Sequence, residues 1–201
     1  GHPWGAVAAL AALVLVLVAG RASAAFSVVA GSLNSHDDLT GVTTLSGNDA
    51  VANVTLPFTF TIDGVGYTSL AISTNGWVEF GGNTHTGAGG ESVSDPGNTC
   101  LPTAEHTNPF LALYWDDTAT FGTNIRYRTV GFAPQRKFLI DAQLDMVSGS
   151  EGADDVSLQV TLFEGTNLIT VRYRDSQYDA NGQSATIGFQ GAGGAAATIV
   201  Q

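Results

Sequence analysis

The sequence of 201 residues is acidic and poor in charge, and this excludes several classes of protein. Charged residues make up 12% of the chain, and 18 Asp and Glu against 7 Lys and Arg give a formal net charge of -11. Because nucleic-acid binding requires clustered Lys and Arg that displace counterions from phosphates, we expect no nucleic acid among the partners.

The first segment of the chain is apolar. Residues 6–19 read AVAALAALVLVLVA, and Arg21 and the small residues Ala22, Ser23 and Ala24 follow. An apolar run before an A-x-A pattern is typical of a secretory signal peptide, here cleaved after Ala24. The alternative is a retained anchor helix, but Arg21 would cost about 2.5–3.5 kcal/mol near the centre of a membrane. We therefore expect residues 1–24 to form a hydrophobic helix, as signal peptide or anchor, and the protein to be secreted or held at the cell surface, with any membrane contact through this segment.

The remaining residues, 25–201, are of a length that suits one domain. A strand is expected within residues 26–33. Alternation is strong in NVTLPFTFTI, where every second residue from Val54 to Ile62 is apolar and most of the others are threonines. Such alternation predicts a strand with one buried face, and Pro57, which lacks a backbone N–H, predicts that the strand lies at a sheet edge.

Two turns are predicted next. Asp63-Gly64 ends this strand, and Asn75-Gly76 is suited to the positive φ angles of a type I′ hairpin. In the hairpin AISTNGWVEFGG, alternation sends Trp77 and Glu79 to the face opposite Val78 and Phe80. A long loop, residues 81–109, follows.

Beyond this loop, PFLALYW is apolar without alternation, which favours a central strand covered on both faces. Further strands are predicted at 125–130, 137–146, 156–163, 168–174 and 185–190, and another where the sequence given stops. Short strands separated by turn residues, with no convincing helical stretch after residue 24, predict an all-β fold, a two-sheet antiparallel β-sandwich.

Five blocks in this order resemble the nidogen-like β-sandwich domain of secreted bacterial surface proteins: LPFTFTIDGVGYTSLAISTNGWVEFGG, NPFLALYWDD, IRYRTVGFAPQRKFLI, DVSLQVTLFEGTNLITVRY and SATIGFQ. The likeness covers about residues 56–190. It implies a non-catalytic extracellular domain of matrix, adhesion and multidomain proteins. It also implies that Asn75-Gly76 is a hairpin tip, Trp115 a core residue, and Asp116-Asp117 the polar exit from the central strand.

Two sets of residues are candidate metal ligands. His85, Cys100 and His106 of the long loop are the residue types of a blue-copper centre, but no Met follows His106 and no ligand spacing is tight, so an exposed flexible loop is favoured. Calcium fits an acidic chain better, because it binds carboxylate and carbonyl oxygens. Its candidate ligands are Asp116, Asp117, Asp179 and Asn181, none of them in an EF-hand spacing. Otherwise we expect no cofactor, and a single cysteine permits no internal disulfide.

Catalysis is a minor alternative. Glu79 and Asp116 are the types of acid that flank a glycosidic bond in a polysaccharide hydrolase, but no pattern fixes their separation. We expect instead a ligand or partner surface around Trp77, Glu79 and Tyr127. The aromatic residues Trp77, Tyr114, Tyr127 and Tyr173 are candidates for a sugar-stacking platform.

The sequence thus predicts a non-catalytic secreted or cell-surface module for adhesion, matrix or assembly interactions with an extracellular protein or glycan. One alternative is a filament or pilus subunit that self-assembles when the strand at 26–33 enters a neighbour's sheet. The other is a carbohydrate-binding module.

Overall fold

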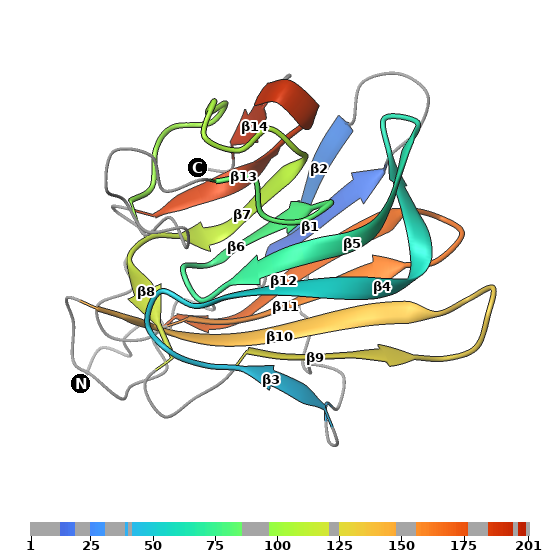
Figure 1. Cartoon of the computed structure of the whole chain (residues 1–201), viewed down its shortest axis with the longest axis horizontal. Helices are drawn as coiled ribbons and strands as arrows, with labels where there is room; N and C mark the ends of the chain where they lie inside the picture. Colours follow the sequence, from blue (N-terminus) through green and yellow to red (C-terminus); the bar gives the residue numbers. More distant parts are fainter. Residues whose placement is uncertain are drawn as a thin grey trace, which may run out of the picture.

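The computed structural model describes residues 13–18, 25–30, 39, 42–85, 97–120, 125–147, 156–176, 185–194 and 197–199. Two antiparallel sheets lie against each other as a sandwich (Figure 1). The predicted fold class is therefore confirmed. Within these ranges, no helix has the length and apolar character needed to span a membrane.

One sheet has six strands. In spatial order they are β14 (Ala197–Ile199), β13 (Thr186–Gln190), β7 (Phe110–Trp115), β6 (Trp77–Phe80), β5 (Val65–Ser73) and β4 (Val51–Ile62). The predicted edge strand is confirmed, because β4 ends the sheet. Its pairing with β5 is irregular between Thr55 and Phe60, the stretch that contains Pro57. β7 lies inside the sheet and is buried along its whole length, as predicted.

The other sheet has eight strands. Along its main path they are β2 (Ala25–Ala30), β1 (Leu13–Val18), β12 (Leu168–Ser176), β11 (Val156–Phe163), β10 (Lys137–Met146), β9 (Ile125–Val130) and β3 (Thr43–Leu45). The short β8 (Thr118–Ala119) pairs with β10, and the 3₁₀ turn η2 spans Ala192–Gly194. The bounds of β9, β10 and β11 are those predicted.

The N-terminal segment differs from the prediction in its described part. Residues 13–18, expected in a helix, form β1, which pairs with β12 from Val14 opposite Arg172 to Val18 opposite Leu168. The run LVLVLV places a β-branched valine at every second position, which favours an extended chain once a partner strand is beside it. The other residues of 1–24 lie outside the described residues, so cleavage after Ala24 stays a prediction.

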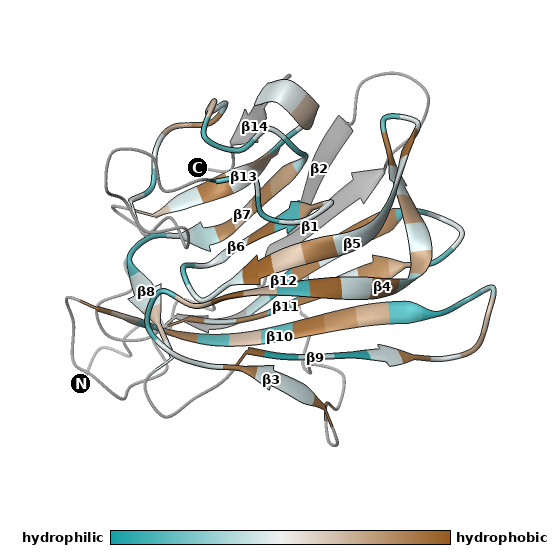
Figure 2. Ribbon diagram, viewed as in Figure 1, coloured by the Kyte–Doolittle hydropathy of each residue, from teal (hydrophilic) through white to brown (hydrophobic). Residues whose placement is uncertain are grey.

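The main core lies between the sheets. Strands of both layers carry hydrophobic residues (Figure 2). β4 contributes the residues that its alternation predicts, Leu56, Phe58, Phe60 and Ile62, all less than a tenth exposed. The Phe60 ring stacks on Phe80 of β6 with the ring centroids 5.4 Å apart. A fully buried side chain of this size contributes about 1.5–3 kcal/mol through the hydrophobic effect.

The two predicted turns differ from each other in type. At Asp63-Gly64 both residues have positive φ, 50° and 82°, and Ile62 pairs with Val65, so the type I′ turn is here. At the second hairpin only Gly76 has positive φ, 73°, and its N–H bonds to the Ser73 carbonyl at 3.3 Å. This is a three-residue connection, a turn followed by a left-handed glycine, and the predicted type I′ turn at Asn75-Gly76 is wrong.

A second hydrophobic cluster covers the outer face of the six-stranded sheet. Its members are Ala71, Trp77, Leu101, Phe110, Ala112 and Trp115. Leu101 belongs to residues 97–108, which we call the strap. Leu101, Thr103 and His106 are buried, so this part of the predicted flexible loop is packed on the sheet. The six-stranded sheet is therefore covered on both faces at β6 and β7.

Candidate functional site

A buried carboxylate joins the two ends of the long loop to β6. Glu79 is fully buried, and its side chain accepts hydrogen bonds from the Thr84 N–H (2.9 Å), the Asn108 N–H (3.3 Å) and the Thr84 hydroxyl. His106 Nδ1 lies 2.9 Å from Glu79 Oε2. Buried charges occur in proteins where they are paired and hydrogen-bonded. Residues 83–85 and 106–108 are thus tied to one carboxylate, an arrangement that we call the clasp.

His106 is also packed among aromatic rings. It is fully buried and stacks on Phe110 with the ring centroids 3.9 Å apart, while Trp77 lies 5.0 Å and Trp115 5.9 Å away. His85, from the start of the loop, lies 5.6 Å from His106 between ring centroids. Two imidazoles therefore lie close together on the clasp.

Gln190 of β13 holds the strap from the other side. Its side-chain oxygen accepts the Thr103 N–H at 2.7 Å, and its Nε2 donates to the carbonyls of Thr103 (3.1 Å) and His106 (3.0 Å). A glutamate and a histidine in contact could act together as a general base. Here both are fully buried beneath the chain's own segments, and the carboxylate already accepts backbone N–H groups, so their contacts fix the loop.

A second polar cluster surrounds the hairpin tip. Asn75 is fully buried, its Nδ2 donates to Asp49 Oδ1 at 2.9 Å, and its Oδ1 accepts the Thr118 N–H at 3.2 Å. Asp117 is exposed, and its pKa is raised by partial burial and by the nearby carboxylates of Asp49 and Asp116. Asp116 Oδ1 accepts the Asp117 N–H at 2.9 Å. The cluster therefore joins the tip to the segments on either side of it.

Neither cluster assembles a metal site. Among the residues that the structure describes, no three His, Cys, Asp or Glu side chains are placed to hold one ion. Cys100 is exposed and does not join His85 and His106 in such a group. Of the predicted calcium ligands, Asp116 and Asp117 adjoin at the end of β7, whereas Asp179 and Asn181 lie outside the described residues, so calcium binding stays a prediction.

A family comparison identifies the domain. Residues 23–201 match the family model described as NIDO related. The chain belongs to the NIDO-related family. NIDO-related domains are typically extracellular, and membership of this family is compatible with secretion of the chain. The match starts at Ser23 and therefore leaves β1 outside. No curated protein and no solved structure shows a match to the chain.

The residue assignments implied by the nidogen-like resemblance agree with this NIDO-related structure. Trp115 is fully buried, and Asp116-Asp117 directly follow β7. Asn75-Gly76 lies at the connection between β5 and β6, although Asn75 is buried there rather than exposed to solvent.

The predicted partner surface is not exposed to solvent, so that prediction is wrong. Trp77 and Glu79 do project away from the main core, as alternation predicts, but the strap and the clasp cover that face, and both side chains are fully buried. Tyr127 is half-buried against the main core, with its ring 6.1 Å from Phe138. Tyr114 and Tyr173 also pack there, and the Tyr173 hydroxyl donates to the Leu113 carbonyl, while burial raises the Tyr173 pKa. The sugar-stacking platform is therefore divided between two buried faces.

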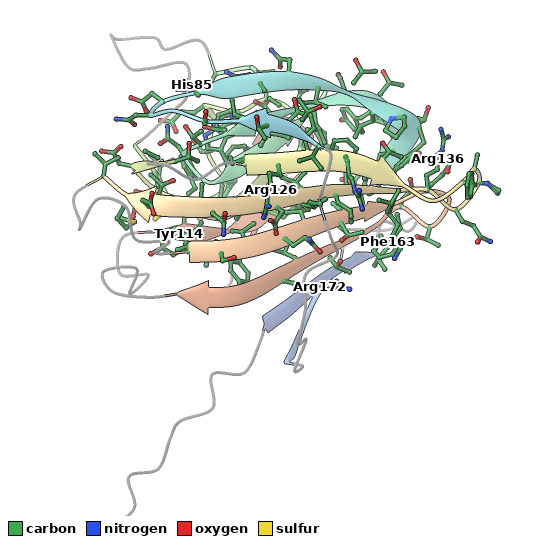
Figure 3. The ribbon with its side chains drawn as sticks, turned by 90° about the horizontal axis from the view of Figure 1, so that it is seen from below. His85, Tyr114, Arg126, Arg136, Phe163 and Arg172 are labelled. Atoms are coloured by element: carbon green, nitrogen blue, oxygen red, sulfur yellow. The ribbon has the colours of Figure 1, made fainter. Side chains whose placement is uncertain are left out.

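An exposed feature that the sequence did not predict lies at the end of the molecule away from the clasp. His85 lies toward one end of the long axis and Arg136 toward the other (Figure 3). Near Arg136, three hairpin connections meet, 63–64, 131–136 and 164–167, which we call the hairpin end. Arg136 donates from its N–H, Nε and NH2 group to Glu164 at 2.9, 2.8 and 2.6 Å, and its guanidinium lies 5.6 Å from the centre of the Phe58 ring. The Thr61 N–H donates to Asn167 Oδ1 at 2.8 Å. These contacts brace the connections against one another.

Phe132 projects from this braced end. It is 91% exposed, and Val65, which begins β5 after the 63–64 turn, is 53% exposed; these are the large hydrophobic residues left exposed within the described ranges. The Phe132 carbonyl accepts the Gln135 N–H at 2.9 Å, which closes the turn. The one sequence signal for this feature is an aromatic residue inside the turn GFAPQ, between two strongly alternating strands.

Proposed function

We propose that this NIDO-related chain is a non-catalytic extracellular module that binds a protein partner through the hairpin end, in adhesion, matrix or assembly interactions. The observation that carries the proposal is the 91% exposure of Phe132 on a turn whose neighbours are fixed by Arg136 and Glu164. Aromatic side chains are enriched among the residues that contribute most to protein interfaces. A turn whose backbone is already held in place loses less conformational freedom when its side chain enters a partner's apolar pocket.

Charge also favours this surface. The tip, residues 131–135, reads GFAPQ and carries no charged side chain, in a chain whose net charge is -11. Exposed residues of one sign repel partners of the same sign. A neutral tip adds no charge repulsion when an acidic extracellular partner approaches a chain of this net charge.

The structural role of the acid–base residues supports the non-catalytic part of the proposal. Glu79 and His106 are fully buried and hold the two ends of the long loop. The acids suggested for a hydrolase, Glu79 and Asp116, come from two separate polar clusters, the clasp and the hairpin-tip cluster.

The test is site-specific photocrosslinking in the protein's native extracellular fluid. A photoreactive phenylalanine analogue replaces Phe132 in the full chain, and the matched control carries it at Ala104, an exposed residue of the strap outside the hairpin end. The proposal predicts one major adduct from position 132 that position 104 does not give and that unlabelled protein competes away. Equal adducts from both positions, or none from position 132, would contradict it.

A second candidate, the self-assembling filament subunit, is favoured by the position of β2. β2 is the outermost strand of the eight-stranded sheet and pairs only on its β1 side among the described strands. An edge of this kind offers main-chain groups to a strand of another copy. Electron microscopy of the purified protein distinguishes the two candidates: regular fibres that Val28→Pro abolishes support the filament, and discrete particles exclude it.

A further inference from the structure

We infer that the edge of β12, which β1 occupies in this structure, accepts strand β2 of a second copy of the chain once residues 1–24 are removed. The inference rests on the filament candidate above and on the predicted cleavage after Ala24, and it names the edge that receives the neighbouring strand. It starts from two observations on β1. This strand lies within the predicted signal peptide and before the family match, which starts at residue 23, yet it is paired into the sheet.

Removal of β1 frees an edge of β12. A strand has two edges, and β12 pairs with β11 along one and with β1 along the other. The pairing with β1 extends from Leu168 to Arg172. Without β1, the backbone N–H and C=O groups along this edge lose their partners. An unpaired edge of this kind is a template for another strand.

The freed edge belongs to a buried part of the sandwich. Ile169 and Val171 are buried and are members of the main core. β1 has Leu17 and Leu15 at the register positions opposite them. Since facing positions of paired strands share one face of a sheet, a strand that replaces β1 needs apolar residues at two alternate positions.

β2 has the length and the alternation that this edge requires. It has six residues, as β1 does, and reads AFSVVA. Phe26 and Val28 are paired with the two leucines of β1, so they have the register of the core face. Ser27 lies between them. The same cleavage separates β2 from β1, so each copy gains a donor strand and an acceptor edge in one event.

Strand direction favours β2 of another copy over the chain's own β2. β1 is antiparallel to both β12 and β2, so β2 and β12 run the same way. If the chain's own β2 moved into the place of β1, it would pair with β12 in parallel, which is slightly less stable per residue. A strand from a second copy is free to enter antiparallel. With Phe26 opposite Val171 and Val28 opposite Ile169, Ser27 then lies opposite Thr170.

Disulfide trapping between two single-cysteine chains tests this pairing. Both full-length chains carry Cys100→Ser and a site-specific protease sequence between Ala24 and Ala25, so that β1 is cut off after purification. One chain carries Ser27→Cys and the other Thr170→Cys, so a disulfide between positions 27 and 170 forms only across copies. After mixing, cutting and mild oxidation, we expect this disulfide as the major product, identified by peptide mass. The uncut mixture should not give it.

Thr161→Cys is the matched control for Thr170→Cys. Thr161 of β11 is buried, pairs with Thr170, and lies one strand further from the edge. It should give no bond to position 27. Proline lacks a backbone N–H and is disfavoured inside a strand. Val28→Pro in the Ser27→Cys chain should therefore abolish the bond to position 170.

The outcomes separate this inference from the filament candidate. Fibres that form without a bond between positions 27 and 170 would leave the filament standing and overturn the acceptor edge at β12. The bond without fibres would support the edge and show that two copies close into a dimer. With both cysteines in one chain, a disulfide confined to monomers would show that the chain's own β2 fills the edge and would overturn the proposal. β1 that stays bound after cutting, or an equal bond to position 161, would also overturn it.

Discussion

Among the described glycines, Gly76 is the one at which the fold leaves the least room for a side chain. A Cβ built on it would lie 2.0 Å from the Tyr114 carbonyl oxygen, and Gly76 has φ of 73°. Its own carbonyl accepts the N–H groups of Leu113 and Tyr114 at 2.9 and 3.0 Å. The hairpin tip is therefore in direct backbone contact with β7, and a side chain at this position would push the two apart.

We predict that Gly76→Ala lowers the free energy of unfolding by about 2–4 kcal/mol, through steric overlap and the positive φ together. Gly64→Ala is the matched control. Gly64 also has positive φ, 82°, but nothing lies within 4 Å of its Cβ position. It should cost only about 1 kcal/mol. Urea unfolding of both variants measures the difference, and equal losses would show that the approach of Gly76 to Tyr114 is not tight.

At the scale of single elements, polar side chains hold the strap and the hairpin end in place. Gln190→Ala removes three hydrogen bonds and leaves the Thr103 N–H and two carbonyls without their partner. Buried groups left unsatisfied cost about 1–3 kcal/mol each, with partial relief if water enters. We expect a loss of about 2–4 kcal/mol in urea unfolding and faster hydrogen exchange in the strap. Unchanged exchange at Thr103 would mean that Gln190 does not hold the strap.

The Arg136–Glu164 contact makes the hairpin end sensitive to acid. Hydrogen bonds from Arg136 lower the pKa of Glu164 from 4.5 to about 2. A lowered folded-state pKa contributes stability that is complete above the unfolded value, near 4.5, and is lost as pH falls toward 2. Glu164→Gln should therefore be less stable than the parent at pH 6, with the gap closing between pH 4.5 and 2. Urea unfolding across that range measures the gap, and a constant gap would indicate that the loss comes from packing.

The strands were predictable where alternation marks one buried face. β10 and β11 have the predicted bounds because their apolar residues repeat every second position and turn residues follow. Turn type was less predictable. Asn75-Gly76 and Asp63-Gly64 look alike in sequence, but Asn75 is fixed by distant contacts with Asp49 and Thr118 that no local pattern reveals.

At the scale of the whole molecule, the predictions failed where a loop covers a sheet. The positions of Trp77 and Glu79 on the outward face were inferred correctly, but alternation cannot tell solvent from a strap folded back over that face. Phe132 presents the opposite case. Its turn was expected, but its exposure depends on the packing of three hairpins that are far apart in sequence.

The claim that Phe132 is available to a partner, and not required for folding, is tested most directly by the free energy of unfolding of Phe132→Ser. Because the ring is 91% exposed, the change should stay within about 0.5 kcal/mol of the parent protein. The buried Phe58→Ser, on the neighbouring β4, should lose about 3 kcal/mol or more in the same assay. A loss of about 2 kcal/mol or more for Phe132→Ser would show that the ring packs within the fold, and the hairpin end would then have no free aromatic anchor.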